Sequence, residues 1–173
     1  LALCLTIIMP TAAHAERVQS AEISALETGV LCAPETIGSA PAPGTLAGTT
    51  HIIAQDPAFI ANSHRVPAVL GVGFGVKSLS ADPEGIAGVT IQLTHPEMGD
   101  ADVTMQSFST SINGDEKSLT FYQFDHSYEL VLGTWEFAAF SGETLLYAVD
   151  FQVVDPRLMP ELAGACGVID LLS

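Results

Sequence analysis

Residues 133–154 read GTWEFAAFSGETLLYAVDFQVV, and this stretch decides the fold. Aromatic and β-branched residues dominate it, as is typical of β-strands. A small polar break, Ser141-Gly142-Glu143, divides it into two segments. In the second segment every odd position from Leu145 to Val153 is apolar, so one face is apolar and the other is largely polar. The stretch therefore predicts a hairpin with one face in a core.

The register of this hairpin depends on where its bulky residues must point. Trp135 and Phe137 occupy odd positions, and residues directly opposite each other in two paired strands lie on the same side of the sheet. Odd positions must therefore pair with odd positions. A loop of three residues, or of another odd number, satisfies this condition with Gly142 or its neighbour in a left-handed conformation. The three-residue loop predicts Trp135 opposite Val149 and Phe137 opposite Tyr147.

The composition limits the class of protein and its partners. A chain of 173 residues, 48% of them hydrophobic, has room for one domain with a real core. Five Lys and Arg against 20 Asp and Glu give a net charge of -15, which argues against nucleic acid as a partner because phosphates would be repelled. The simplest interpretation of the charge is the solvated acidic surface of an exported protein, and the alternative is binding of divalent cations.

The N-terminal residues have the pattern of the second half of a secretory signal peptide. Residues 1–8 are apolar and Ala13-His14-Ala15 is a small-x-small site, so we expect residues 1–15 to be a signal peptide remnant. Its apolar stretch is too short to span a bilayer. Its removal leaves Cys32 and Cys166, which we expect to form a disulfide in a periplasmic or secreted protein. Closing so long a loop stabilises a fold by about 4 to 5 kcal/mol in the chain-entropy model.

Turn signals such as Asn113-Gly114-Asp115 separate several other strand-like segments. These segments are residues 23–31, 65–77, 88–94, 103–111 and 118–124. Residues 33–49 are rich in Pro, Gly, Ala and Ser and predict a long surface loop, and residues 156–173 predict a tail tied back by the disulfide. Seven strands without a long amphipathic helix predict an all-β fold. The expected domain is an immunoglobulin-like antiparallel β-sandwich over residues 16–155.

A stripe of glycines is the first candidate site. Gly71, Gly73 and Gly75 alternate with apolar residues that face the core, so they leave a bare stripe on the opposite face. Either the chain's own Pro-rich segment or an external ligand or partner would cover it. The pattern is not followed by a helix, which argues against a dinucleotide fingerprint.

An acidic loop is the second candidate site. His95, Glu97, Asp100 and Asp102 crowd into one segment, and their hard ligands could hold Ca²⁺, although the spacing is not that of an EF-hand. A polar loop with a turn is the alternative, and we expect no other cofactor. For catalysis, G-x-S-x-G and H-E-x-x-H are absent from the sequence, and adjacent residues such as Asp125-His126-Ser127 rarely aim at one point. We therefore expect the protein not to be an enzyme.

Five segments carry a resemblance to known proteins: residues 71–76, 94–98, 124–125, 128–131 and 133–135. Together they resemble an uncharacterised family of exported bacterial proteins with a single immunoglobulin-like domain. The resemblance implies that fold over residues 23–156 and implies no activity. We predict an exported, non-enzymatic binding or structural module of the cell envelope, whose partner is a protein, a glycan or a small molecule. The alternative is a periplasmic protein that binds a metal or small ligand through residues 95–102.

Overall fold

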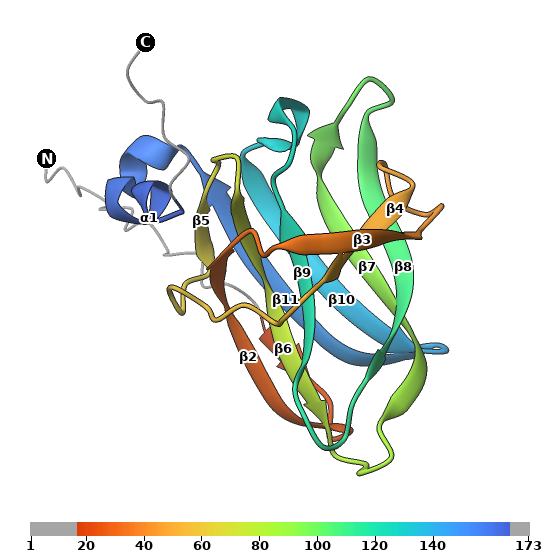
Figure 1. The fold of residues 1–173 in the computed structure, drawn as a ribbon. Helices are drawn as coiled ribbons and strands as arrows, with labels where there is room; N and C mark the ends of the chain where they lie inside the picture. The colour runs from red at the N-terminus through yellow and green to blue at the C-terminus, as the bar shows by residue number, and fades with distance from the viewer. Residues whose placement is uncertain (1–16, 167–173) are drawn as a thin grey trace, which may run out of the picture.

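The computed structural model describes residues 17–166, which form a two-layered β-sandwich (Figure 1). One sheet has the order β1-β11-β10-β7-β8, with β5 also paired to β11, and the other has the order β2-β6-β9. A separate hairpin, β3–β4, lies across one side of the sandwich. The strands are β1 (Arg17–Gln19), β2 (Ile23–Cys32), β3 (Thr36–Pro41), β4 (Thr49–Ile53), β5 (Arg65–Pro67), β6 (Val72–Ser80), β7 (Ile86–Met98), β8 (Val103–Ile112), β9 (Ser118–Gln123), β10 (Gly133–Ser141) and β11 (Thr144–Val154).

The strand order is that of the immunoglobulin fold. The seven principal strands, in chain order, are β2, β6, β7, β8, β9, β10 and β11. The first, second and fifth of them (β2, β6 and β9) form one sheet, and the third, sixth and seventh (β7, β10 and β11) lie together in the other. The fourth, β8, joins the second sheet beside β7, and all these pairs are antiparallel. Short β5 runs parallel to β11. The predicted immunoglobulin-like sandwich is confirmed.

The β10–β11 pair keeps the predicted parity. Trp135 lies opposite Phe151 and Phe137 lies opposite Val149, so odd positions do pair with odd positions. Each partner is two residues further along β11 than we predicted. The apolar faces of both strands therefore meet the same core, as the alternation required.

The turn of this hairpin differs from the prediction. Ser141 pairs with Thr144, so the turn has two residues, Gly142 and Glu143, and the predicted three-residue loop is wrong. A β-bulge after Ala139 shifts the register by one residue and restores the odd-with-odd pairing. Gly142 has a φ of 59°, so the predicted left-handed glycine is confirmed. A tight turn with Gly at its first central position follows the twist of the strands better than a longer loop does.

The core lies between the two sheets and is organised around Phe74. The centre of its ring lies 5.6 Å from that of Trp135, 5.8 Å from that of Phe137 and 5.1 Å from that of Phe151. These side chains are at most 1% exposed. The edge-to-face and tilted contacts that they make suit the charge distribution of aromatic rings. The prediction that Trp135 and Phe137 occupy the centre of the sandwich is confirmed.

Residues 33–49, which we predicted as a loop, contain β3 and lead into β4. The two strands pair over Thr36–Pro41 and Thr49–Ile53 and have mostly exposed side chains. Without a buried face, a strand shows no alternation of apolar and polar residues, so the pattern could not reveal this hairpin. Pro41 lies at the end of β3, where the missing N–H is tolerated.

Two other strands also differ from the sequence prediction. The segment 65–77 is interrupted at residues 68–71, which separate β5 from β6. The strand that we ended at His95-Pro96 continues as β7 to Met98. Pairing of β7 with β10 stops at Thr94, and its pairing with β8 is irregular between Thr94 and Met98, so the ladder needs no donor from Pro96.

The C-terminal segment is tied to the sandwich as predicted. A 3-10 turn, Pro156–Leu158, and the short helix α1 (Pro160–Gly164) lead to Cys166. Cys166 is bonded to Cys32 at the end of β2, with Cα atoms 5.2 Å apart, so the predicted disulfide is confirmed. The predicted signal remnant lies outside the described residues. Across residues 17–166, helices long and apolar enough to cross a membrane are lacking.

Candidate functional site

The glycine stripe is covered by the protein itself. Gly73 and Gly75 are buried. A Cβ atom at Gly75 would lie 2.2 Å from the carbonyl oxygen of Thr120 on β9, and one at Gly73 would lie 2.6 Å from Cδ1 of Leu31 on β2. Gly71, with a φ of 82°, forms the turn that enters β6. These glycines let neighbouring segments approach β6 closely, so the stripe is not the open ligand surface that the sequence allowed. The atoms nearest to Gly73 and Gly75 belong to the neighbouring strands β2 and β9 rather than to residues 33–49.

His95, the first residue of the predicted metal loop, belongs to the interior. It is 4% exposed, and its ring lies 4.7 Å from that of Trp135. Nδ1 lies 2.8 Å from the carbonyl oxygen of Pro96, and Nε2 lies 3.0 Å from the amide nitrogen of Gln106. Because its burial disfavours a charge, the pKa of His95 is lowered from its ordinary value. The ring is therefore neutral and both of its nitrogens are occupied.

The carboxylates of that loop do not join His95. His95 follows the buried alternation of Val89, Ile91 and Leu93 along β7, whereas the irregular backbone between Thr94 and Met98 leaves Glu97 exposed. Asp100 and Asp102 are exposed in the following turn. Among residues 17–166, His, Cys, Asp and Glu nowhere gather in a group of three or more that could hold a metal ion. The structure therefore does not assemble the Ca²⁺ site that the sequence allowed.

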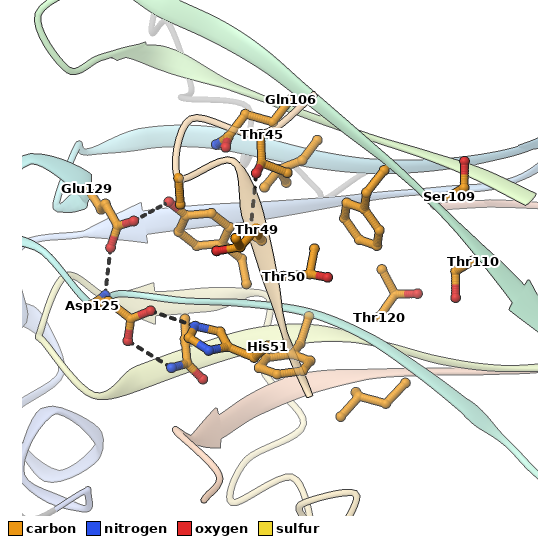
Figure 2. Close-up of a pocket in the computed structure, with 17 residues that line it drawn as sticks. Thr45, Thr49, Thr50, His51, Gln106, Ser109, Thr110, Thr120, Asp125 and Glu129 are labelled. Carbon is orange, nitrogen blue, oxygen red and sulfur yellow. Dashed lines mark hydrogen bonds and ion pairs between the residues drawn. The ribbon is translucent and has the colours of Figure 1, made fainter. Parts of the chain in front are cut away.

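A pocket of about 240 Å³ opens instead between β8, at the edge of one sheet, and β9, at the edge of the other (Figure 2). The β3–β4 hairpin and the loop that joins its strands form the roof. Phe108, Phe121 and Tyr122 contribute aromatic rings to the walls. The remaining lining is rich in hydroxyl groups, from Thr45, Thr49, Thr50, Ser109, Thr110 and Thr120.

The buried carboxylate of Glu129 lies at one end of the pocket, where it binds the backbone of residues 125–126 (Figure 2). Glu129 is 6% exposed. Oε1 accepts a hydrogen bond from the Tyr122 hydroxyl at 2.8 Å, and Oε2 accepts from the backbone N–H groups of Asp125 at 2.6 Å and His126 at 2.8 Å. Burial and the neighbouring carboxylate raise the pKa of Tyr122, which therefore stays protonated and donates. Three donors thus compensate the charge of Glu129.

A chain of hydrogen bonds ties the roof to the core. His95 donates from Nδ1 to the Pro96 carbonyl, so its Nε2 accepts from the Gln106 amide nitrogen. The Gln106 oxygen, now directed outward, accepts the backbone N–H of Leu46 at 2.7 Å. The backbone N–H of Ser107 also donates to Gly44 in the same loop at 2.8 Å. The inner wall of the pocket therefore positions the loop between β3 and β4.

A hydrogen bond between His51 and Asp125 connects the open side of the roof to the sandwich. His51 Nε2 on β4 lies 2.7 Å from Asp125 Oδ2, and Asp125 Oδ1 accepts from the Gln123 amide nitrogen at 2.8 Å (Figure 2). His51 Nδ1 also lies 3.4 Å from the Thr36 hydroxyl. Thr, His and Asp are residue types found in catalytic triads, but 3.4 Å is long for a hydrogen bond, and all three residues are exposed. Their evident role is to hold the hairpin on the sandwich.

The fold and this site define the class of protein: an immunoglobulin-like β-sandwich with a roofed pocket at its open edge. The chain belongs to the DUF3859 family, a domain of unknown function whose sequence profile matches residues 19–153. It is also similar to an immunoglobulin-like protein from Pseudomonas aeruginosa of known crystal structure, with 20% identity, coverage of 84% of this chain and 100% of that chain, and a TM-score of 0.49. No curated protein matches the chain.

Sequence reasoning missed the pocket. Its roof comes from residues that we predicted as a loop, and its walls come from two strands assigned to different sheets. One signal was present in the sequence. Gln106, Thr120 and Gln123 are polar residues that are buried in or at the end of strands, where alternation would normally place apolar side chains. Polar residues at such positions mark a place where the interior is not a simple hydrophobic core.

Proposed function

We propose that this protein is an exported, non-enzymatic binding module that takes a small ligand in the pocket beneath the β3–β4 hairpin. The observation that carries the proposal is the cavity of about 240 Å³ between the diverging edges of β8 and β9. Protein interiors are normally close-packed, and a concave site with aromatic walls and a few polar groups is the usual form of a small-ligand site.

Export is supported by two features. The Cys32–Cys166 disulfide suits an oxidising compartment, and residues 1–15 have the pattern of a signal remnant. We therefore propose a periplasmic or secreted location. The net charge of -15 suits a soluble protein and disfavours a phosphate-rich partner.

The roof gives this module a way to admit its ligand. Within residues 17–166 the polar contacts between the hairpin and the sandwich are few, namely the His51–Asp125 bond, the Leu46–Gln106 bond and the Gly44–Ser107 bond. The strands of the hairpin have mostly exposed side chains, so lifting it uncovers little of the core. Segments with few buried contacts open most easily.

Native mass spectrometry tests the proposal. The mature protein is released gently from its own cells, without refolding, beside two variants. Thr50→Trp places an indole in the pocket, and Ser39→Trp places the same group on an exposed position of β3 as the matched control. We expect a small-molecule adduct on the wild type and on Ser39→Trp, and none on Thr50→Trp. Bare protein in all three samples, or an adduct that persists on Thr50→Trp, would overturn the proposal.

A further inference from the structure

We propose that the outer edge of β8 is a docking site for an extended, basic segment of a partner protein, which adds to the sheet as a further strand. This goes beyond the proposed function, because the occupant is a peptide backbone at a strand edge rather than a small ligand in the pocket. The proposal is drawn from the pairing of β8, from its sequence and from the charges beside it.

The outer edge of β8 has unpaired backbone groups. β8 is the last strand of its sheet and pairs with β7 alone (Figure 1). The backbone N–H of Ser107 points away from β7, because it donates to the Gly44 carbonyl at 2.8 Å. Backbone groups alternate between the two sides of a strand, so those of Ser109 and Ser111 point the same way. Across residues 17–166 no other backbone group pairs with these two exposed residues.

The chain itself already uses this edge at one position. Besides accepting from Ser107, Gly44 approaches it so closely that a Cβ atom on the glycine would lie 2.4 Å from the Ser107 carbonyl oxygen. The loop between β3 and β4 thus brings a second backbone against β8 at Gly44. A partner segment would continue this pairing along Ser109 and Ser111.

The sequence of β8 lacks the features that usually protect an exposed edge. Such edges are commonly short, charged, interrupted by Pro or covered by another segment. The ten residues Val103–Ile112 contain no Asp, Glu, Lys, Arg or Pro. By contrast, β1 at the other end of the same sheet has three residues, one of them Arg17, and the edge of β2 is bonded to residues 60–61. A long, neutral edge of this kind favours pairing with another strand.

An open hollow beside this edge gives the partner space and selects its charge. It has a volume of about 550 Å³ and lies between the ends of β8 and β9 and the segment that follows β4. Asp56 and Glu116 line it, and within residues 17–166 neither carboxylate has an ion-pair partner. Lys117, the one cation among the described lining residues, binds Glu27. The hollow therefore favours Lys or Arg in the partner, whereas a second copy of the chain would bring like charges.

A proline at the edge tests strand addition. Ser109→Pro removes an outward N–H and none that pairs with β7, and proline is tolerated at such positions of an edge strand. Ser109→Ala keeps the N–H and is the matched control. Random peptides displayed on phage are selected on the wild type, and enriched peptides are synthesised and measured by fluorescence anisotropy. We expect Pro-free, β-branched sequences with Lys or Arg, whose affinity Ser109→Pro weakens about tenfold or more and Ser109→Ala leaves unchanged.

Two further measurements do not depend on the proline variant. In hydrogen exchange on the wild type, the amides of Ser109 and Ser111 should exchange rapidly in the free protein and about tenfold or more slowly with saturating peptide. The amide of Ser107, which is already bonded, should be protected in both states. Glu116→Gln should weaken the peptide about threefold at low salt and less at high salt. Circular dichroism establishes that each variant is folded.

The outcomes decide the proposal. Slower exchange at Ser109 and Ser111, together with weaker binding by Ser109→Pro, supports it. The absence of any enriched peptide, equal binding by the wild type and Ser109→Pro, or unchanged exchange overturns it. Enrichment of acidic peptides overturns the basic partner. A wild-type dimer in sedimentation that Ser109→Pro converts to a monomer also overturns it, because the edge then pairs with a second copy of the chain.

Discussion

Gly75→Ala should strongly destabilise the sandwich, because this glycine lies where two strands touch. The new Cβ atom would meet the Thr120 carbonyl oxygen at 2.2 Å and the Phe121 Cα atom at 2.7 Å. Both are backbone atoms, so no rotamer change can move them away, and ordinary contact requires β6 and β9 to separate by about 1 Å or more. Overpacking costs roughly 1–3 kcal/mol and sometimes more. We expect a loss of about 3 kcal/mol in the free energy of unfolding.

Urea unfolding, followed by fluorescence, measures this loss. Trp135 is the single tryptophan and is fully buried, so its emission reports on the core. The matched control is Gly38→Ala on the exposed hairpin, where the nearest atoms to a Cβ belong to Ile52 and lie 3.7 Å or more away. The control should be neutral or stabilised by up to about 1 kcal/mol, because alanine reduces the entropy of the unfolded chain. A loss of less than about 1 kcal/mol for Gly75→Ala would refute the close-packing argument.

Three further predictions concern the disulfide, the buried carboxylate and the buried histidine. Replacing Cys32 and Cys166 together by Ser should lower the free energy of unfolding by about 4 kcal/mol in denaturant titrations, and an unchanged midpoint would contradict this. Glu129→Leu leaves three donors without an acceptor and should lower the free energy of unfolding by about 3 kcal/mol. Glu129→Gln can still accept from the backbone and donate to the Tyr122 oxygen, so its loss should be about half as large. Equal losses in the two variants would show that the hydrogen bonds are not the cause. Because the pKa of His95 is lowered in the folded state, the unfolded chain binds the extra proton as the pH falls below 6.5, so stability should decline from there down to the folded-state pKa. His95→Gln should show a smaller decline in unfolding experiments between pH 7.5 and 5.5, and an identical decline would assign the effect to other groups.

Much of the fold could be read from local patterns. The alternation in residues 144–154 identified the apolar face of β11, and the odd positions of Trp135 and Phe137 required an odd-with-odd register, which the structure has. The cysteine count led to the Cys32–Cys166 pair. These features are visible in the sequence because burial of one face imposes a period of two, and because removal of the expected signal remnant takes away Cys4 and leaves two of the three cysteines, which allow a single pairing.

The sequence did not show how the chain produces the odd-with-odd register of β10 and β11. The odd-with-odd pairing can arise from an odd loop or from a two-residue turn with a bulge, and both satisfy the alternation equally well. The turn geometry at Gly142 and the packing of the strands choose between them. The strand end that we predicted at Pro96 was wrong for a similar reason. A proline is tolerated within a strand wherever the neighbouring strands need no N–H donor from it, and this holds at Pro96 of β7.

The candidate site is formed only by the tertiary structure and could not be predicted from the sequence. The residues of the glycine stripe and of the acidic loop are close together in sequence. In the structure β9 and Leu31 occupy the space beside the glycines, and the residues of the acidic loop separate because His95 faces the core while Glu97, Asp100 and Asp102 are exposed. The pocket joins segments that are far apart in the chain, through pairs such as His51 with Asp125 and Leu46 with Gln106. Periodicity along one strand determines which side of that strand is buried. Which polar groups meet across a cavity depends on how two sheets and a hairpin pack together, and only the folded chain decides that.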